Sequence, residues 1–101
     1  MARKTRERED LEKLSADVQK IFHLVAIKEC CYAFVGLTVN IVTYFLILQR
    51  GKVILETDIP ALIQGVKQAL LLLQQEDFLQ SEKRDQGTIY FLTRKGERAF
   101  V

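Results

Sequence analysis

The sequence predicts one domain of the mainly helical α+β class, in which a two-stranded β hairpin follows several helices. Three observations support this prediction. The 101 residues are 49% hydrophobic and 28% charged, which is the balance of a compact soluble domain. Apolar residues recur at helical spacing in the first and middle thirds of the chain. Near the C-terminus, two short β-rich runs flank a turn that contains a glycine.

The N-terminal third is expected to hold a tail and one long helix. Residues 1–14 are polar and begin with a basic cluster, so we expect a solvated tail in which residues 7–14 can form an exposed helix. Ser15 is a candidate N-cap for a helix over residues 16–34 that ends near Gly36. The apolar stripe of that helix is wider than a small core requires, and we expect residues 15–35 to pair two subunits as a homodimer. The side chains assigned to the dimer interface are Val18, Ile21, Phe22 and Val25.

The next segment can be interpreted in two ways. Residues 38–49 are rich in β-branched side chains, but their length and the following Gly51 favour a helix with a terminating glycine. The uncharged run over residues 30–49 is also long enough to span a bilayer. The Gly, Thr and Asn residues within it favour turns and caps of a soluble domain instead, and no membrane partner is expected.

Several short elements are predicted downstream. Residues 52–55 favour a short strand, and a helix follows with Pro60 in its first turn. Gly65 is expected to break this helix into pieces over residues 58–64 and 66–76. Four consecutive leucines, residues 70–73, cannot all face one side, so Leu71 or Leu72 is expected to lie partly outside the core and suggests a partner surface. The predicted strands are residues 78–83 and 88–92, and Thr93 is a candidate cap for a terminal helix.

Few residues are of the types that carry enzyme or metal chemistry. The chain has one histidine and two cysteines, so we expect neither an enzyme nor a bound metal or cofactor. His23 is predicted to lie at the surface. On a helix, Cys30 and Cys31 point about 100° apart and cannot easily share a metal ion, although a redox-sensing thiol or an intersubunit disulfide stays open. No apolar run with a small-residue cleavage site lies within the first 15 residues, so a secretory signal is not expected and a cytoplasmic location is predicted.

The net charge of +2 is unevenly distributed. Residues 1–8 carry a net charge of +3 and residues 83–101 another +3, whereas residues 9–82 carry −4. The acidic residues at positions 9, 10 and 12 are interpreted as a solvated helix face, because no pocket or apolar shell is expected around them.

The C-terminal pieces occur in a recurring order. A helix ends in LQQEDFL (residues 73–79), the turn reads KRDQG (83–87) and the last strand leads into YFLTRKG (90–96). This order resembles the winged-helix DNA-binding regulators of the MarR and PadR kind. The resemblance implies a winged helix-turn-helix over residues 15–101, with a two-stranded β wing and an extra N-terminal helix. It also implies a small homodimeric transcriptional regulator that binds double-stranded DNA at a pseudo-palindromic site.

The resemblance assigns roles to the polar residues. A helix that carries Gln64, Lys67 and Gln68 would enter the major groove, where lysine reaches guanine and glutamine pairs with adenine. The wing would contact phosphates or the minor groove, and the terminal helix and the basic N-terminus would add backbone contacts. The residues assigned to these further contacts are Lys83, Arg84, Arg94, Lys95, Arg3, Lys4 and Arg6.

The sequence also departs from the family pattern. The spacing between Gly51 and Leu73 is short for two helices, so the second helix is expected to be truncated, and Asp77 stands where a glycine usually follows the recognition helix. That helix has a single lysine, and its glutamines also fit a plain solvated face. The alternative function is therefore a winged helix that binds protein rather than DNA.

Overall fold

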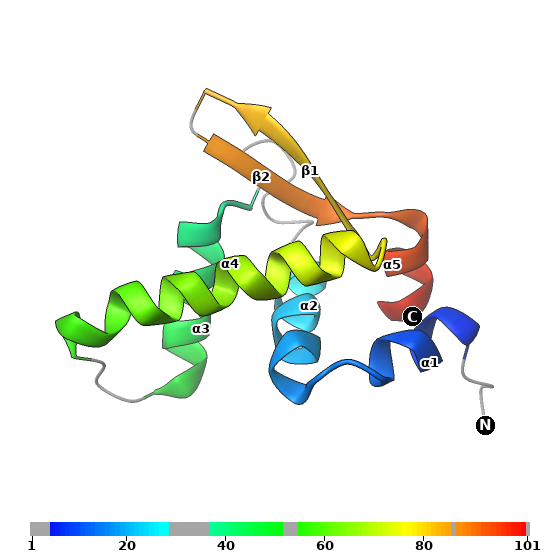
Figure 1. The fold of residues 1–101 in the computed structure, drawn as a ribbon, viewed down its shortest axis with the longest axis horizontal. Coiled ribbons are helices and arrows are strands. Elements are labelled where there is room, and N and C mark those ends of the chain that lie inside the picture. Colours follow the sequence, from blue (N-terminus) through cyan, green and yellow to red (C-terminus); the bar gives the residue numbers. More distant parts are fainter. Residues whose placement is uncertain (1–4, 29–36, 52–54, 86, 101) are drawn as a thin grey trace.

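The computed structural model describes residues 5–28, 37–51, 55–85 and 87–100. It is mainly helical with one two-stranded antiparallel sheet, as predicted (Figure 1). The elements are α1 (Arg6–Glu12), α2 (Ala16–Lys28), α3 (Val39–Arg50), the 3-10 helix η2 (Glu56–Asp58), α4 (Ile59–Gln75), β1 (Leu79–Arg84), β2 (Gly87–Leu92) and α5 (Arg94–Phe100).

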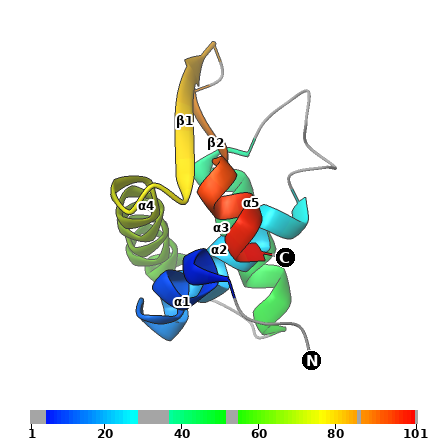
Figure 2. The same ribbon diagram turned by 90° about the vertical axis from the view of Figure 1, so that its right-hand side faces the viewer.

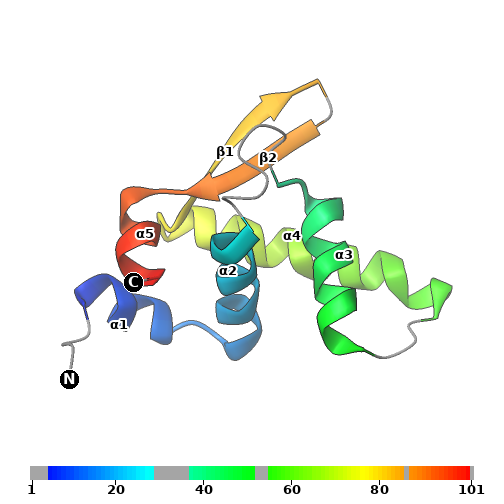
Figure 3. The same cartoon turned by 180° about the vertical axis from the view of Figure 1, so that it is seen from behind.

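The core lies where α2, α3 and α4 meet beneath the hairpin. Figure 3 shows α2 and α3 side by side in front of α4, with the hairpin above them. Phe22 of α2 meets Phe78 edge to face at 5.8 Å between ring centroids, and Leu70 and Leu73 of α4 are fully buried. Close-packed aromatic and leucine side chains of this kind supply most of the stabilisation of a small domain.

The side chains predicted to form a dimer interface on α2 are buried within a single chain. Phe22 and Val25 have no exposed surface, and Val18 and Ile21 are 9% and 6% exposed within a single chain. The wide apolar stripe is used within the chain, because α2 packs against α3, α4 and β2. The prediction that this helix extends to residue 34 falls partly outside the described residues, as do Cys30 and Cys31.

The two middle helices, α3 and α4, each run without interruption. The α3 helix follows the prediction, since the Thr38 hydroxyl accepts a hydrogen bond from the Ile41 amide and Gly51 ends the helix at φ +61°. The α4 helix runs without a break through Gly65, so both the predicted break and the predicted truncation are wrong. One helical glycine costs only about 1 kcal/mol. Burial of Val66, Leu70 and other apolar side chains along the same face outweighs that cost.

The hairpin has the predicted turn. Its register pairs Leu79 with Leu92 at one end and Arg84 with Gly87 at the other. Gly87 has φ +122°, a conformation that favours glycine. On its other side β2 bridges the segment before α3, where the Tyr90 amide donates to the Leu37 carbonyl at 2.8 Å. The predicted strand at residues 52–55 lies mostly outside the described residues.

The N-terminal segment is not wholly a solvated tail. Residues 6–12 form α1, and its Leu11 is 1% exposed in the core. The helix packs on α5, where the Thr5 hydroxyl donates to the Arg98 carbonyl at 3.3 Å and the Arg98 guanidinium lies 3.5 Å from the Glu7 carboxylate. Figure 2 shows the two terminal helices against each other, below the hairpin. Burial of Leu11 and the polar contacts with Arg98 together hold this short helix against the rest of the chain.

No described helix is both long enough and apolar enough to cross a membrane. No group of three or more His, Cys, Asp or Glu side chains in that part of the chain is placed to hold a metal ion.

Candidate nucleic-acid interface

The outward face of α4 carries the three side chains predicted to read bases. Gln64, Lys67 and Gln68 are all exposed on the face opposite the core. Figure 1 shows α4 running across the front of the molecule, with that side uncovered by other elements. Lys67 is the only charged residue in α4, and Leu71 lies on the same face with 54% of its surface exposed. This face is therefore nearly uncharged, with hydrogen-bonding amides, one cation and one apolar side chain.

Acidic residues lie beyond both ends of this face. Glu56 and Asp58 precede α4, and Glu76 and Asp77 follow it, and all four are exposed. Carboxylates repel phosphate, so any DNA contact by α4 would have to be made through its central turns, between Gln64 and Leu71.

The hairpin tip is less basic than the charge count suggested. The Arg84 guanidinium lies 3.2 Å from the Glu82 carboxylate and donates a hydrogen bond to it. Lys83 and Asp85 are exposed beside this pair. Lys83 forms no ion pair with another described residue, whereas Arg84 is already partnered. Both residues were predicted as wing contacts, and in the structure the guanidinium of Arg84 is engaged by Glu82 while Lys83 has no such ion pair with another described residue.

Lys95 is held within the chain, which departs from its predicted role as a backbone contact. Its ammonium donates to the Glu76 carbonyl at 3.1 Å, lies 3.8 Å from the Asp10 carboxylate and sits 4.6 Å from the centroid of the Phe78 ring. A cation placed on the last carbonyls of a helix also offsets the helix dipole. The lysine of the YFLTRKG segment therefore fastens α5 to the end of α4. Its neighbour Arg94 is exposed and forms no ion pair within the described chain.

Threonine and glycine of the same segment complete this fastening. The Thr93 hydroxyl donates to the Asp77 carbonyl and accepts from the Gly96 amide at 3.0 Å, as the predicted cap of α5 should. At Gly96, an added Cβ would lie 2.2 Å from the Phe78 carbonyl oxygen. Only a glycine lets α5 approach the chain this closely.

The corner between α4 and β1 explains the departure at Asp77. This residue has φ +67°, the left-handed conformation that a glycine usually supplies after a helix. The Asp77 amide donates to the Gln74 carbonyl at 3.1 Å, and the Phe78 amide donates to the Leu73 carbonyl at 2.8 Å. These two bonds form a Schellman motif, so the turn is made without its glycine.

The basic N-terminus lies apart from the hairpin. Arg6 is exposed on α1, and Figures 1 and 2 both place α1 on the opposite side of α4 from the hairpin. Arg3 and Lys4 lie outside the described residues. The structure therefore brings together α4, the hairpin and the start of α5, and it leaves Arg6 away from the hairpin.

Sequence reasoning missed one feature of this region. A hollow lies along one flank of α4, between it and the first half of α2, and Gln68 lines it. Periodicity separates inward from outward residues, but the gap between two helices depends on their packing and leaves no local signal.

No family model, no curated protein and no solved structure matches this chain.

Proposed function

We propose that this chain is a DNA-binding protein with a winged helix-turn-helix fold, in which α3 and α4 form the helix pair and the hairpin forms the wing. The order of elements supports this: α2, the bridging residue Leu37, α3, α4 and then β1 and β2, with Leu37 bonded to Tyr90 as an added short pairing. A helix presented in this way can enter a major groove while an adjacent hairpin meets the backbone.

The observation that carries the proposal is the free face of α4 beside a hairpin with an available cation. Amide side chains at Gln64 and Gln68 supply donor and acceptor pairs for base edges, and Lys67 supplies a cation between them. Lys83 and Arg94 lie on the elements that follow. Lys67, Lys83 and Arg94 form no ion pair with other described residues, and these three cations are the candidates for phosphate contact.

The salt dependence of DNA binding tests this proposal. Three phosphate contacts per chain give a slope of about −2.7 in log K against log salt, so affinity falls about 40-fold between 50 and 200 mM salt. Fluorescence anisotropy with random-sequence duplex DNA measures this slope. Undetectable binding at 50 mM salt would remove the proposal.

Matched variants separate the two kinds of contact. Lys83→Ala should weaken binding to all sequences and reduce the steepness of the salt slope by about 0.9. Gln68→Ala should change the preference among sequences selected from a random pool and leave the slope unchanged. Lys13→Ala is the control, because Lys13 is an exposed lysine between α1 and α2 whose ammonium lies 3.6 Å from Asp10. An equal loss with Lys13→Ala would mean that binding reflects net charge only.

We further propose that regulation by this protein uses two copies, as a pseudo-palindromic site requires. The buried residues of α2 are not available for pairing. The exposed large apolar side chains Ile27, Tyr44 and Leu48 are available, and Tyr44 and Leu48 lie one helical turn apart on α3. Sedimentation equilibrium measures the association, and a monomer at 100 μM would contradict it.

A second candidate function is protein binding, and the exposure of Leu71 in the middle of the α4 face favours it. An apolar side chain there suits a protein groove better than a phosphate backbone. Under this alternative, Leu71→Gln would abolish partner capture, whereas DNA binding would be absent in every variant. The same anisotropy experiment thus distinguishes the two functions.

A further inference from the structure

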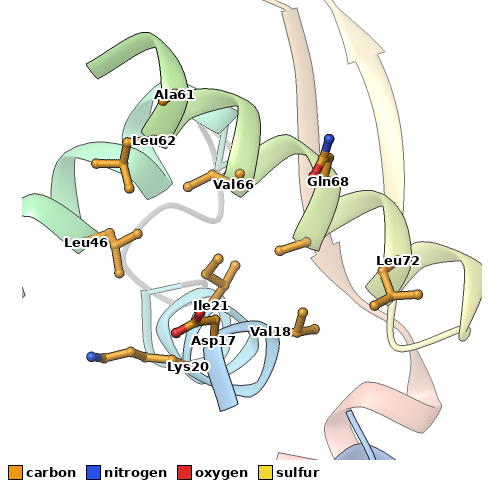
Figure 4. Close-up of a pocket in the computed structure, with 12 residues that line it drawn as sticks. Asp17, Val18, Lys20, Ile21, Leu46, Ala61, Leu62, Val66, Gln68 and Leu72 are labelled. Carbon is orange, nitrogen blue, oxygen red and sulfur yellow. The ribbon is translucent and has the colours of Figure 1, made fainter. Parts of the chain in front are cut away.

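The hollow on the flank of α4 is not accounted for by the proposed function. It has a volume of about 390 Å³ and is lined by residues of α2, α3 and α4 (Figure 4). Its walls are mostly aliphatic. The apolar residues that line it include Val18, Ile21, Leu46, Leu62, Val66 and Leu72. We call this hollow the α2–α4 groove.

Gly65 keeps one wall of the α2–α4 groove open. A glycine in the middle of a 17-residue helix costs about 1 kcal/mol relative to alanine. Gly65 has no positive φ, and a Cβ built on it would meet no other heavy atom within 4 Å. Neither the backbone conformation nor close packing therefore requires a glycine here. Its effect is to leave room beside the helix backbone.

The polar groups at the groove have a definite arrangement. Figure 4 shows the Lys20 side chain extending sideways from α2 with its ammonium at the outer end, and the Gln68 amide directed away from α2. The Asp17 carboxylate lies beside Ile21 on the α2 side of the groove. It forms no ion pair with another described residue. Of the polar side chains that line the groove, Asp17 is thus the one whose charged group the view places beside an apolar wall residue.

We propose that the α2–α4 groove binds a small molecule that has an apolar body and one ammonium group. The volume falls in the lower part of the range typical of ligand pockets, so one ring or a short alkyl chain fits. The apolar body displaces water from Ile21, Leu46 and Val66, and the ammonium lies against Asp17. Aliphatic walls and a carboxylate do not suit a phosphate backbone, and a stable protein interface buries about 800 Å² per partner over a broad area rather than a hollow.

Titration by two-dimensional ¹H–¹⁵N NMR of the full chain tests this proposal without any DNA. The probes are 4-phenylbutylamine, 4-phenylbutan-1-ol and 4-phenylbutanoate, which share a body and differ in the charge of one group. We expect saturable shifts of the amides of residues 17, 21, 65 and 69 with the amine, at a dissociation constant on the order of 1 mM. The alcohol should bind about 2- to 5-fold more weakly, as expected for loss of one exposed ion pair, and the carboxylate more weakly still.

Variants locate the binding within the groove. Gly65→Leu fills the groove and should abolish the shifts, whereas Gln75→Leu adds the same side chain to α4 outside the groove and should leave them unchanged. Asp17→Asn should equalise the amine and the alcohol, and Asp85→Asn at the hairpin should not. This pair also tests the proposal if Gly65→Leu fails to fold.

Three results would overturn the proposal. Shifts that do not saturate at 10 mM amine, equal binding of the three probes to the unchanged chain, or binding that persists in a folded Gly65→Leu variant would each exclude the assigned site. Loss of the amine shifts as protein concentration rises, with a dimer in sedimentation, would show that a second copy occupies the groove instead. None of these results depends on whether the chain binds DNA.

Discussion

Replacing a glycine by alanine should have opposite effects at two helical positions of this chain. At Gly96 an added Cβ would lie 2.2 Å from the Phe78 carbonyl oxygen, which is 0.8 Å closer than the 3.0 Å limit of real Cβ contacts. It would also lie 3.2 Å from the Leu92 side chain. The nearest atom belongs to the backbone and cannot rotate away. Relief requires α5 to move outward, which lengthens the 3.2 Å hydrogen bond from the Thr93 amide to that same oxygen.

The magnitude follows from these contacts. Overpacking costs about 1–3 kcal/mol and the weakened hydrogen bond about 1 kcal/mol, whereas alanine returns about 1 kcal/mol through its better helix propensity. Gly96→Ala should therefore lower the free energy of unfolding by about 1–3 kcal/mol. Gly65→Ala is the matched control, because open space surrounds its Cβ, and it should raise that free energy by about 0.5–1 kcal/mol.

Urea unfolding followed by circular dichroism measures both changes. With a slope of about 2 kcal/mol/M, the midpoint of Gly96→Ala should fall by about 1 M at an unchanged slope, and that of Gly65→Ala should rise slightly. If Gly96→Ala is as stable as the parent, then α5 does not pack against Phe78 as described. A loss at Gly65→Ala would instead refute the open wall of the α2–α4 groove.

Three further predictions concern other parts of the chain. Asp77→Gly should raise the free energy of unfolding by about 0.5–1 kcal/mol in the same urea assay, because glycine adopts φ +67° without the Cβ penalty, and a loss would contradict the Schellman turn. Lys95→Met should lower it by about 1 kcal/mol through the lost Glu76 and Asp10 contacts while leaving the salt slope of DNA binding unchanged; a slope that falls by about 0.9 would show that Lys95 contacts phosphate after all. Leu48→Glu should shift the chain toward monomer in sedimentation equilibrium, with Gln75→Glu as a control of equal charge, and an unchanged association constant would exclude the exposed α3 face.

Local signals in the sequence accounted for the elements that have local causes. A hydrogen bond to the Thr38 hydroxyl begins α3, and the left-handed φ of Gly51 ends it. The positive φ of Gly87 makes the hairpin turn, and the Thr93 hydroxyl caps α5. Leu71 or Leu72 was expected to lie partly outside the core because four leucines in a row cannot share one helix face, and Leu71 is 54% exposed. In each case the cause lies within a few residues of its effect.

The failures have non-local causes. Nothing near Gly65 shows that the helix continues, since the stabilising burial comes from residues of α2 and α3 packed against α4. The stripe of α2 looked excessive because the hairpin that also packs on it lies more than 50 positions away in the chain. The carbonyl that the Lys95 ammonium contacts belongs to Glu76, 19 residues earlier, so the neighbouring sequence does not show that this cation is engaged. Charge and periodicity describe segments, whereas these properties belong to pairs of segments.

The pairing of β2 has a consequence for how copies of this chain can meet. β2 pairs with β1 along one side and forms a single bridge to Leu37 on the other, and the free side of β1 is one edge of this two-stranded sheet. The second half of that edge consists of Glu82, Lys83 and Arg84, all exposed. Charged side chains on an exposed edge oppose the addition of another strand. Strand addition from one copy to the next is therefore disfavoured along the β1 edge of the hairpin.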